Sequence, residues 1–295
     1  MPEPISIGTY TIPNLLYSRL NHEVELLKKE GFPLIIDIDK IGEFTFLGFN
    51  LQDLANNQEE EAVQTMKCYL ADCLAGLIVD EWEARILRKI IRENFYYYNE
   101  EEKQAILAKT REMLNPPGPD EYLLKERKDK VMLKIIEYLE LHKEIILEGF
   151  INFRLKEYQD ELEGIVNSAV DEFLLEKEYL EFIRLLKYFV DIQEPKISKI
   201  KIIFKTNGNF TLLDEYDKPV QHECLDGLMV DLLEKEINYE DLLISALITL
   251  APQEIEIHLE KEAQIGETIR TIQNVFGKRV IYCQGCEKCQ TQRQK

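Results

Sequence analysis

The stretch "LKEYQDELEGIVNSAVDEF" (residues 155–173) decides the predicted fold class of this 295-residue chain. Its apolar side chains recur at spacings of three or four, which places them on one face of an α-helix. The apolar positions are Leu155, Tyr158, Leu162, Ile165, Ala169 and Phe173. Because this stripe is broader than the two-position seam of a coiled coil, the pattern favours a helix that packs on other helices.

Helical spacing extends beyond this stretch, from about residue 120 to residue 190. A single rod of that length would exceed about 100 Å, so we expect two or three helices packed on one another. The sequence "NPPGPD" (residues 115–120) precedes this region, and a helix cannot run through its three prolines. Residues 59–111 also show helical spacing, so the middle of the chain is predicted to be a helical bundle.

The two ends of the chain show β patterns. The first 50 residues combine a short alternating run, a helical segment and a β-rich stretch around Gly42, which predicts a small N-terminal α/β segment. After Pro195, two β-rich runs flank the hairpin sequence "TNGN", and a helical segment, a strand, a helix and a strand follow. We predict an α+β protein that is predominantly α-helical and ends in a small α+β domain with a β-hairpin. The expected domains are residues 1–115, 120–193 and 196–295.

Acidic residues outnumber basic ones by 55 to 36, which gives a formal net charge of −19. Such a surface repels phosphate backbones and disfavours nucleic-acid binding, although the C-terminal residues are locally basic. The N-terminal sequence lacks the basic and apolar regions of a signal peptide, and no apolar run approaches the roughly 18 residues of a membrane helix. We therefore expect a cytoplasmic chain without membrane insertion, whose cysteines are free, metal-bound or redox-active.

Three cysteines near the C-terminus, in "CQGCEKC", form the strongest chemical motif. Thiolates at this spacing converge on one point, and Gly285 allows a tight backbone between the first two. Zinc prefers four ligands, so we expect a fourth donor from "QHEC", either His222 or Cys224. The predicted metal ligands are Cys283, Cys286, Cys289, Cys224 and His222.

The cysteine motif is also compatible with functions other than zinc binding. An iron–sulfur cluster is a second option, but the bacterial ferredoxin run continues to a fourth cysteine followed by proline, which this chain lacks. A dithiol redox pair of Cys283 and Cys286 is a third option, and a tail without any cofactor is a fourth. His258 alternates with apolar residues in "EIEIHLE", so we expect it to face solvent beside Glu256.

Aromatic side chains suggest an interaction surface. Four consecutive rings occur in "NFYYYNE", and one helical turn cannot point all of them into a core. They predict either a seam between domains or a partner site, because tyrosine is enriched at interfaces. The sequence "GFINFR" adds two phenylalanines and an arginine. The candidate surface residues are Tyr96, Tyr97, Tyr98, Phe150, Phe153 and Arg154.

Residues Glu148 to Gln193, followed by a hairpin, "LITLAP" and "CQGCEKC", resemble the YtxC-like family of sporulation-associated proteins. The resemblance covers roughly the last 150 residues and implies a cytoplasmic protein of a spore-forming bacterium, without an assigned activity. The family brings no catalytic residues to this sequence.

Three functional hypotheses follow, of which one, a nucleic-acid binder with a zinc knuckle, is opposed by the net charge of −19. The first is an interaction or regulatory protein with a structural metal at the C-terminal cysteines, a protein partner and an open question of homo-oligomerisation. The alternative is a redox enzyme or iron–sulfur protein that uses the same cysteines. Because the sequence contains none of the common catalytic motifs, the first hypothesis is favoured.

Overall fold

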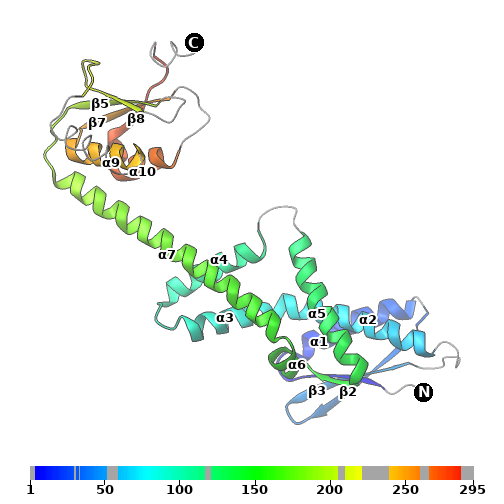
Figure 1. Ribbon diagram of the computed structural model, residues 1–295. Helices are drawn as coiled ribbons and strands as arrows, with labels where there is room; N and C mark the ends of the chain where they lie inside the picture. Colours follow the sequence, from blue (N-terminus) through cyan, green and yellow to red (C-terminus); the bar gives the residue numbers. More distant parts are fainter. Residues whose placement is uncertain are drawn as a thin grey trace. The chain divides into compact units, whose positions relative to one another are not determined.

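The computed structural model describes residues 4–29, 31–32, 34–51, 59–116, 121–204, 210–220, 239–259 and 266–286 (Figure 1). The chain divides into two compact units, Met1–Leu174 and Leu175–Lys295. Among the described residues, helices predominate and each unit contains one small mixed sheet. The predicted fold class, a predominantly helical α+β protein, is confirmed.

The first unit contains a four-stranded sheet with the order β2-β3-β1-β4. Strands β2 and β3 form a hairpin around Gly42, whose φ of +62° suits glycine in a tight turn. Strand β1 pairs antiparallel with β3 and parallel with β4. The bounds are β1 Ile5–Thr9, β2 Leu34–Ile41, β3 Phe44–Leu51 and β4 Glu144–Ile146, and helix α1 is Pro13–Lys29.

Helices form most of the first unit, and their buried sides share one large core with the sheet. Helix α2 packs along α5, and the π-helical turn η1 joins α2 to α3. The region from 120 to 190 forms three helices, as the sequence predicted. The bounds are α2 Glu59–Leu77, η1 Ile78–Trp82, α3 Glu83–Asn94, α4 Glu100–Leu114, α5 Glu121–Leu141, α6 Leu147–Arg154 and α7 Lys156–Ile192. Residues 175–192 of α7 belong to the second unit.

One part of this core corrects the sequence analysis. The continuous helical stretch Glu60–Asn94 contains an 18-residue window that is long and apolar enough to cross a membrane by length and composition. However, 56% of this window is buried inside the protein. Leu70, Leu74 and Ile78 of this helical stretch belong to the core of the first unit. Packing in this core explains why the stretch is apolar.

The second unit contains a sheet with the order β6-β5-β7-β8. Strands β5, β7 and β8 run parallel, and β6 pairs antiparallel with β5. Helices α9 and α10 lie on one face of this sheet (Figure 1), and their apolar sides pack against Ile200, Ile255 and Ile257. The bounds are β5 Lys199–Phe204, β6 Phe210–Leu213, α9 Tyr239–Leu250, β7 Glu254–Leu259, α10 Glu267–Phe276 and β8 Val280–Tyr282.

Candidate metal centre

The carboxyl ends of β7 and β8 bring together a histidine and two cysteines. Parallel strands end at the same edge of a sheet, so His258 near the end of β7 lies beside the segment that follows β8. The backbone N–H of Cys283 donates to the carbonyl of Ile257 at 2.9 Å, which continues the strand pairing past Tyr282. This bond fixes the start of the "CQGC" turn against β7.

The turn itself points its thiols inward. Gly285 has a φ of +115°, a conformation that side chains other than hydrogen rarely tolerate. The N–H of Gly285 lies 3.5 Å from the Sγ of Cys283, an orientation that would stabilise a thiolate. The glycine predicted to permit a tight turn therefore has that conformation.

The donor atoms of His258, Cys283 and Cys286 all lie within 4.8 Å of one another. The Nδ1 of His258 is 3.4 Å from the Sγ of Cys286. A tetrahedral zinc ion with bond lengths of about 2.1 Å to nitrogen and 2.3 Å to sulfur would separate such atoms by about 3.6 Å. The spacing therefore matches an edge of a zinc coordination tetrahedron.

His258 differs from the sequence expectation. It lies on the polar face of β7 beside Glu256, as the alternation indicated, but only 4% of its surface is exposed. The expectation that His258 faces solvent is wrong, because the "CQGC" turn folds over the end of the strand. Two thiol-bearing residues, Cys283 and Cys286, are half-buried there with it.

A charged chain supports the histidine from the side opposite Cys286. The Nε2 of His258 lies 3.6 Å from Oε1 of Glu256, and Oε2 of Glu256 lies 2.8 Å from Nζ of Lys199. The hydrogen bond from Lys199 lowers the pKa of the Glu256 carboxyl, against the opposing effect of burial. A carboxylate that accepts a hydrogen bond from a ligating histidine commonly fixes the orientation of its ring, but the 3.6 Å separation here is longer than a hydrogen bond, so Glu256 contributes only its nearby negative charge.

Other residues predicted to bind metal, Cys289, Cys224 and His222, lie outside the described residues. The structure adds His258, which sequence reasoning missed. His258 and Cys283 are separated by α10, and only the parallel pairing of β7 with β8 reveals that they meet.

Cys68 and Cys73 are both half-buried in α2. Burial, reinforced by the nearby Glu23 carboxylate, raises the pKa of Cys73 to about 12. Cys73 packs against the main core, so its thiol behaves as a small apolar group.

The aromatic candidates separate into buried and exposed residues. The four rings lie in the turn between α3 and α4, which ends at the Asn99 cap of α4. Tyr98 is buried, and its ring lies edge-on to that of Phe173 with the centroids 5.8 Å apart. Phe150 is a core residue. The prediction that Tyr98 and Phe150 lie on the surface is therefore wrong. The exposed candidates are Tyr96, Tyr97, Phe153 and Arg154.

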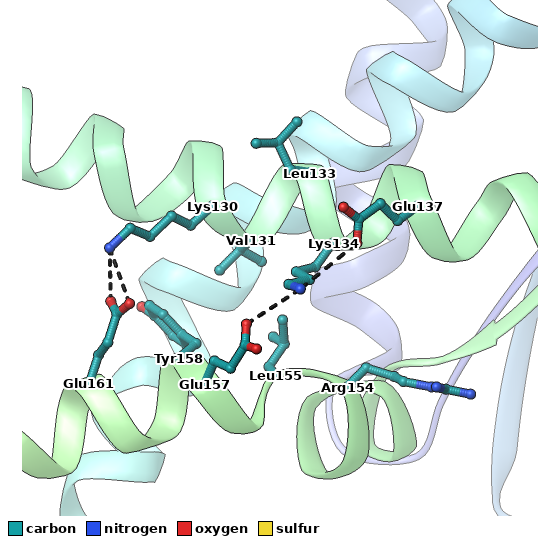
Figure 2. Close-up of a pocket in the computed structure, with 10 residues that line it drawn as sticks. All are labelled: Lys130, Val131, Leu133, Lys134, Glu137, Arg154, Leu155, Glu157, Tyr158 and Glu161. Atoms are coloured by element: carbon teal, nitrogen blue, oxygen red, sulfur yellow. Dashed lines mark hydrogen bonds and ion pairs between the residues drawn. The ribbon is translucent and has the colours of Figure 1, made fainter.

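A groove of about 290 Å³ lies between α5 and the start of α7 (Figure 2). Its buried floor includes Val131, Leu155 and Tyr158. Two ion pairs join its sides: the Lys130 ammonium with Glu161 at 3.0 Å, and Lys134 with Glu157 at 3.4 Å. Because these charges are satisfied within the protein, the groove is a weaker candidate site than the Cys/His group.

Beneath this groove, the Glu83 carboxylate is buried with two hydrogen-bond donors. Its Oε2 accepts from Nε of Arg127 at 3.1 Å and from the hydroxyl of Tyr158 at 2.5 Å. The Arg127 guanidinium also donates to the Leu114 carbonyl and to the Asn115 side chain, both at 2.8 Å. The network connects α3, α5 and α7 with the end of α4 and has a structural role.

The fold and site define a two-unit, predominantly helical α+β protein with a Cys/His group at the edge of its smaller sheet. The chain belongs to the YtxC-like family, whose model matches residues 68–281. It is 28% identical over 217 residues to the uncharacterized protein YtxC of Bacillus subtilis (strain 168), covering 72% of this chain and 75% of that protein. No solved structure matches it.

Proposed function

We propose that this chain is a cytoplasmic interaction protein of sporulating cells, and that a structural metal ion stabilises its second unit. The ion proposed is zinc. The observation that carries the metal is the convergence of His258, Cys283 and Cys286 within 4.8 Å. These residues supply the nitrogen and sulfur ligands that zinc prefers. Cys289, three residues after Cys286, is the natural fourth ligand in sequence.

The role of the ion would be structural. An ion shared by His258 and the two thiolates joins β7 to the segment after β8, so it closes a loop that includes α10. A small unit with a small core gains more from such a link than a large one. Three protein ligands with a fourth cysteine leave no open coordination position, which is typical of structural zinc.

Elemental analysis of anaerobically purified protein tests this proposal. About one zinc per chain is expected in the wild type, and it should be lost in His258→Ala and in Cys283→Ser/Cys286→Ser. Cys68→Ser is the matched control, because this half-buried cysteine lies on α2 in the first unit. Retention of the metal in His258→Ala would contradict the proposed ligand set, and a metal-free wild type would contradict the metal itself.

A visible absorption spectrum of the same samples separates zinc from an iron–sulfur cluster, because only the cluster is coloured. Replacement of the ion by cobalt gives a second readout, since thiolate ligands produce intense charge-transfer bands. These bands should disappear in Cys283→Ser/Cys286→Ser.

A redox function is the second candidate. The 3.4 Å approach of the His258 ring to Cys286 favours it, because an imidazole beside a thiol can stabilise the thiolate. Reversible formation of a disulfide between Cys283 and Cys286 in metal-free protein, observed by mass spectrometry across a series of redox buffers, would support this candidate. A thiol pair that remains reduced in all of these buffers would exclude it.

The family resemblance carries the cellular part of the proposal. Deletion of the Bacillus subtilis relative should lower the yield of heat-resistant spores, and this chain should restore it. The Cys283→Ser/Cys286→Ser variant then shows whether the Cys/His group matters for that role. An unchanged spore yield after deletion would contradict the association with sporulation.

A further inference from the structure

The four-stranded sheet of the first unit has one face in the core and one face outside it. Successive side chains of β3 point to opposite faces, and Leu47 and Phe49 on one face are buried in the core. Phe44, Phe46 and Asn50 point to the opposite face and are partly exposed. We call this second face of the sheet the outer face.

The pairing of the strands shows which other residues share the outer face, because residues directly opposite each other in neighbouring strands lie on the same face. Asp37 of β2 is opposite Gly48, and Asp39 is opposite Phe46. A hydrogen bond confirms this placement, since Nδ2 of Asn50 donates to Oδ2 of Asp37 at 2.7 Å. Two carboxylates therefore lie on the outer face beside the side chains of β3.

Three aromatic rings form a continuous surface on the outer face. The side chain of Tyr10 is 52% exposed, and its ring lies edge-on to that of Phe44 with the centroids 5.3 Å apart. The ring centroids of Phe44 and Phe46 are 6.1 Å apart. Gly8 is opposite Phe46, and a Cβ atom there would be only 2.5 Å from the Phe46 ring, so glycine lets this ring lie against β1. The rings make an apolar surface outside the core of the unit.

The charges on the outer face are all negative. Glu144 of β4 is opposite Ser6, which is itself opposite Gly48, so this exposed carboxylate joins those of Asp37 and Asp39. No lysine or arginine occupies an outer-face position in the four described strands. Asp37 and Asp39 form no ion pair within the part of the chain that the structure describes. A partner with positive charge would therefore be complementary to this face.

Arginine is the side chain that suits both the rings and the carboxylates of this face. Its guanidinium stacks on aromatic rings and donates paired hydrogen bonds to a carboxylate. Directly opposite residues in a sheet have Cβ atoms about 4.5–5.5 Å apart, so a guanidinium over the Phe46 ring can also reach the Asp39 carboxylate. The net charge of −19 adds a long-range attraction for a basic partner. A second copy of the outer face, or a nucleic-acid backbone, would instead meet charge of its own sign.

We infer that the outer face of this sheet binds an arginine-rich segment of a partner protein. Arginine side chains of that segment stack on Phe44 and Phe46 and donate to the carboxylates of Asp37 and Asp39. The inference rests on the proposed interaction function, which it deepens by assigning the surface and the chemistry of the partner. It does not depend on the proposed metal, because the Cys/His group lies in the second unit.

Fluorescence anisotropy tests the inference with a fluorescein-labelled peptide of alternating arginine and serine, titrated with the full chain at physiological ionic strength. Saturable binding is expected, and Asp37→Asn/Asp39→Asn should weaken it at least about fivefold. Glu112→Gln/Asp160→Asn is the matched control, because it changes the net charge equally at exposed positions of α4 and α7. Equal weakening by the two variants, or no saturable binding by the wild type, would overturn the inference.

A second pair of variants tests the aromatic surface. Tyr10→Ser removes an exposed ring of the outer face and should weaken binding about threefold, whereas Tyr122→Ser, at a position 72% exposed on α5, should not change it. A peptide of alternating lysine and serine should bind more weakly than the arginine peptide, because an ammonium does not stack flat on a ring. Equal binding of the two peptides would overturn the selection of arginine, and a Tyr10→Ser variant that binds like the wild type would overturn the role of the rings.

Further measurements separate this inference from the proposed function. Far-UV circular dichroism of each variant establishes that the chain remains folded. The Cys283→Ser/Cys286→Ser variant should bind the arginine peptide like the wild type, since the outer face lies in the first unit. A wild-type chain that contains the metal and restores sporulation, but does not bind the peptide, would overturn this inference and leave the proposed function in place.

Discussion

The two units of this chain differ in the partners that their clustered polar side chains have. In the first unit, the buried Glu83 carboxylate is satisfied by Arg127 and Tyr158 of the same unit. In the second unit, two thiols and an imidazole converge at the edge of a sheet, where a metal ion can join them. The first arrangement is complete in the protein itself, whereas the second brings together donor atoms of the kind that bind metal ions.

The two units also differ in the size of their cores. The core of the first unit draws on a sheet and several helices, whereas that of the second rests on α9, α10, three parallel strands and the end of α7. The described core of the second unit has fewer buried residues than that of the first, so the proposed metal link is expected to add more to its stability.

The largest effect is expected from Arg127→Met in the first unit. It leaves the Glu83 carboxylate buried without its cation, which should lower the free energy of unfolding by about 3–5 kcal/mol. Trp82 is the single tryptophan of the chain and belongs to the first unit, so its fluorescence in a urea titration reports this change. The triple variant Glu83→Leu/Arg127→Met/Tyr158→Phe should recover most of the loss. A triple variant no more stable than Arg127→Met would contradict the explanation.

Removal of the metal is the corresponding change in the second unit. A free metal concentration one hundred times its dissociation constant would stabilise this unit by about 2.7 kcal/mol, and a chelator should abolish that amount. Far-UV circular dichroism should show part of the helix signal melting earlier, while the Trp82 transition stays in place. A chelator that moves the Trp82 transition equally would contradict a link confined to the second unit.

A smaller and pH-dependent effect is expected at Glu148 in the first unit. Burial alone would raise the pKa of this carboxyl, but hydrogen bonds from Thr9 and Thr11 outweigh it, and the pKa is lowered. A lowered pKa in the folded state stabilises the fold above the unfolded pKa of about 4.3, and this stability is lost as the pH falls through the folded value.

Glu148→Gln should therefore cost about 1–2 kcal/mol at pH 7, measured by urea titration of Trp82 fluorescence. The cost should shrink as the pH falls below about 4. Glu144→Gln, at a nearby exposed position, is the control and should change little. A cost that does not vary with pH would show that the charge of Glu148 is unimportant.

The smallest effect concerns thiol reactivity and leaves stability unchanged. Because the pKa of Cys73 is raised to about 12, iodoacetamide at pH 8 should label it slowly as long as the first unit is folded. Cys283 should become reactive as soon as the metal is removed. Mass spectrometry of peptides after timed labelling measures both rates, and fast labelling of Cys73 in the native protein would contradict its burial.

Much of the fold was predictable from the sequence because helical and strand periodicity are local properties. The spacing of Tyr158, Leu162 and Ile165 specifies a helix wherever it lies, and Gly42 specifies a turn between two β-rich runs. The cysteine motif was equally visible, since the spacing of Cys283 and Cys286 already implies convergent thiols. These features depend only on neighbours in the chain.

The tertiary structure decided which residues complete these local features. His258 meets the cysteines only because β7 and β8 are parallel neighbours, and the turn that buries it follows a different strand. Tyr98 and Phe150 looked like surface residues beside exposed neighbours, yet distant helices cover them. Burial and ligand sets depend on contacts between residues far apart in the chain, and the periodicity of a single segment carries no information about such contacts.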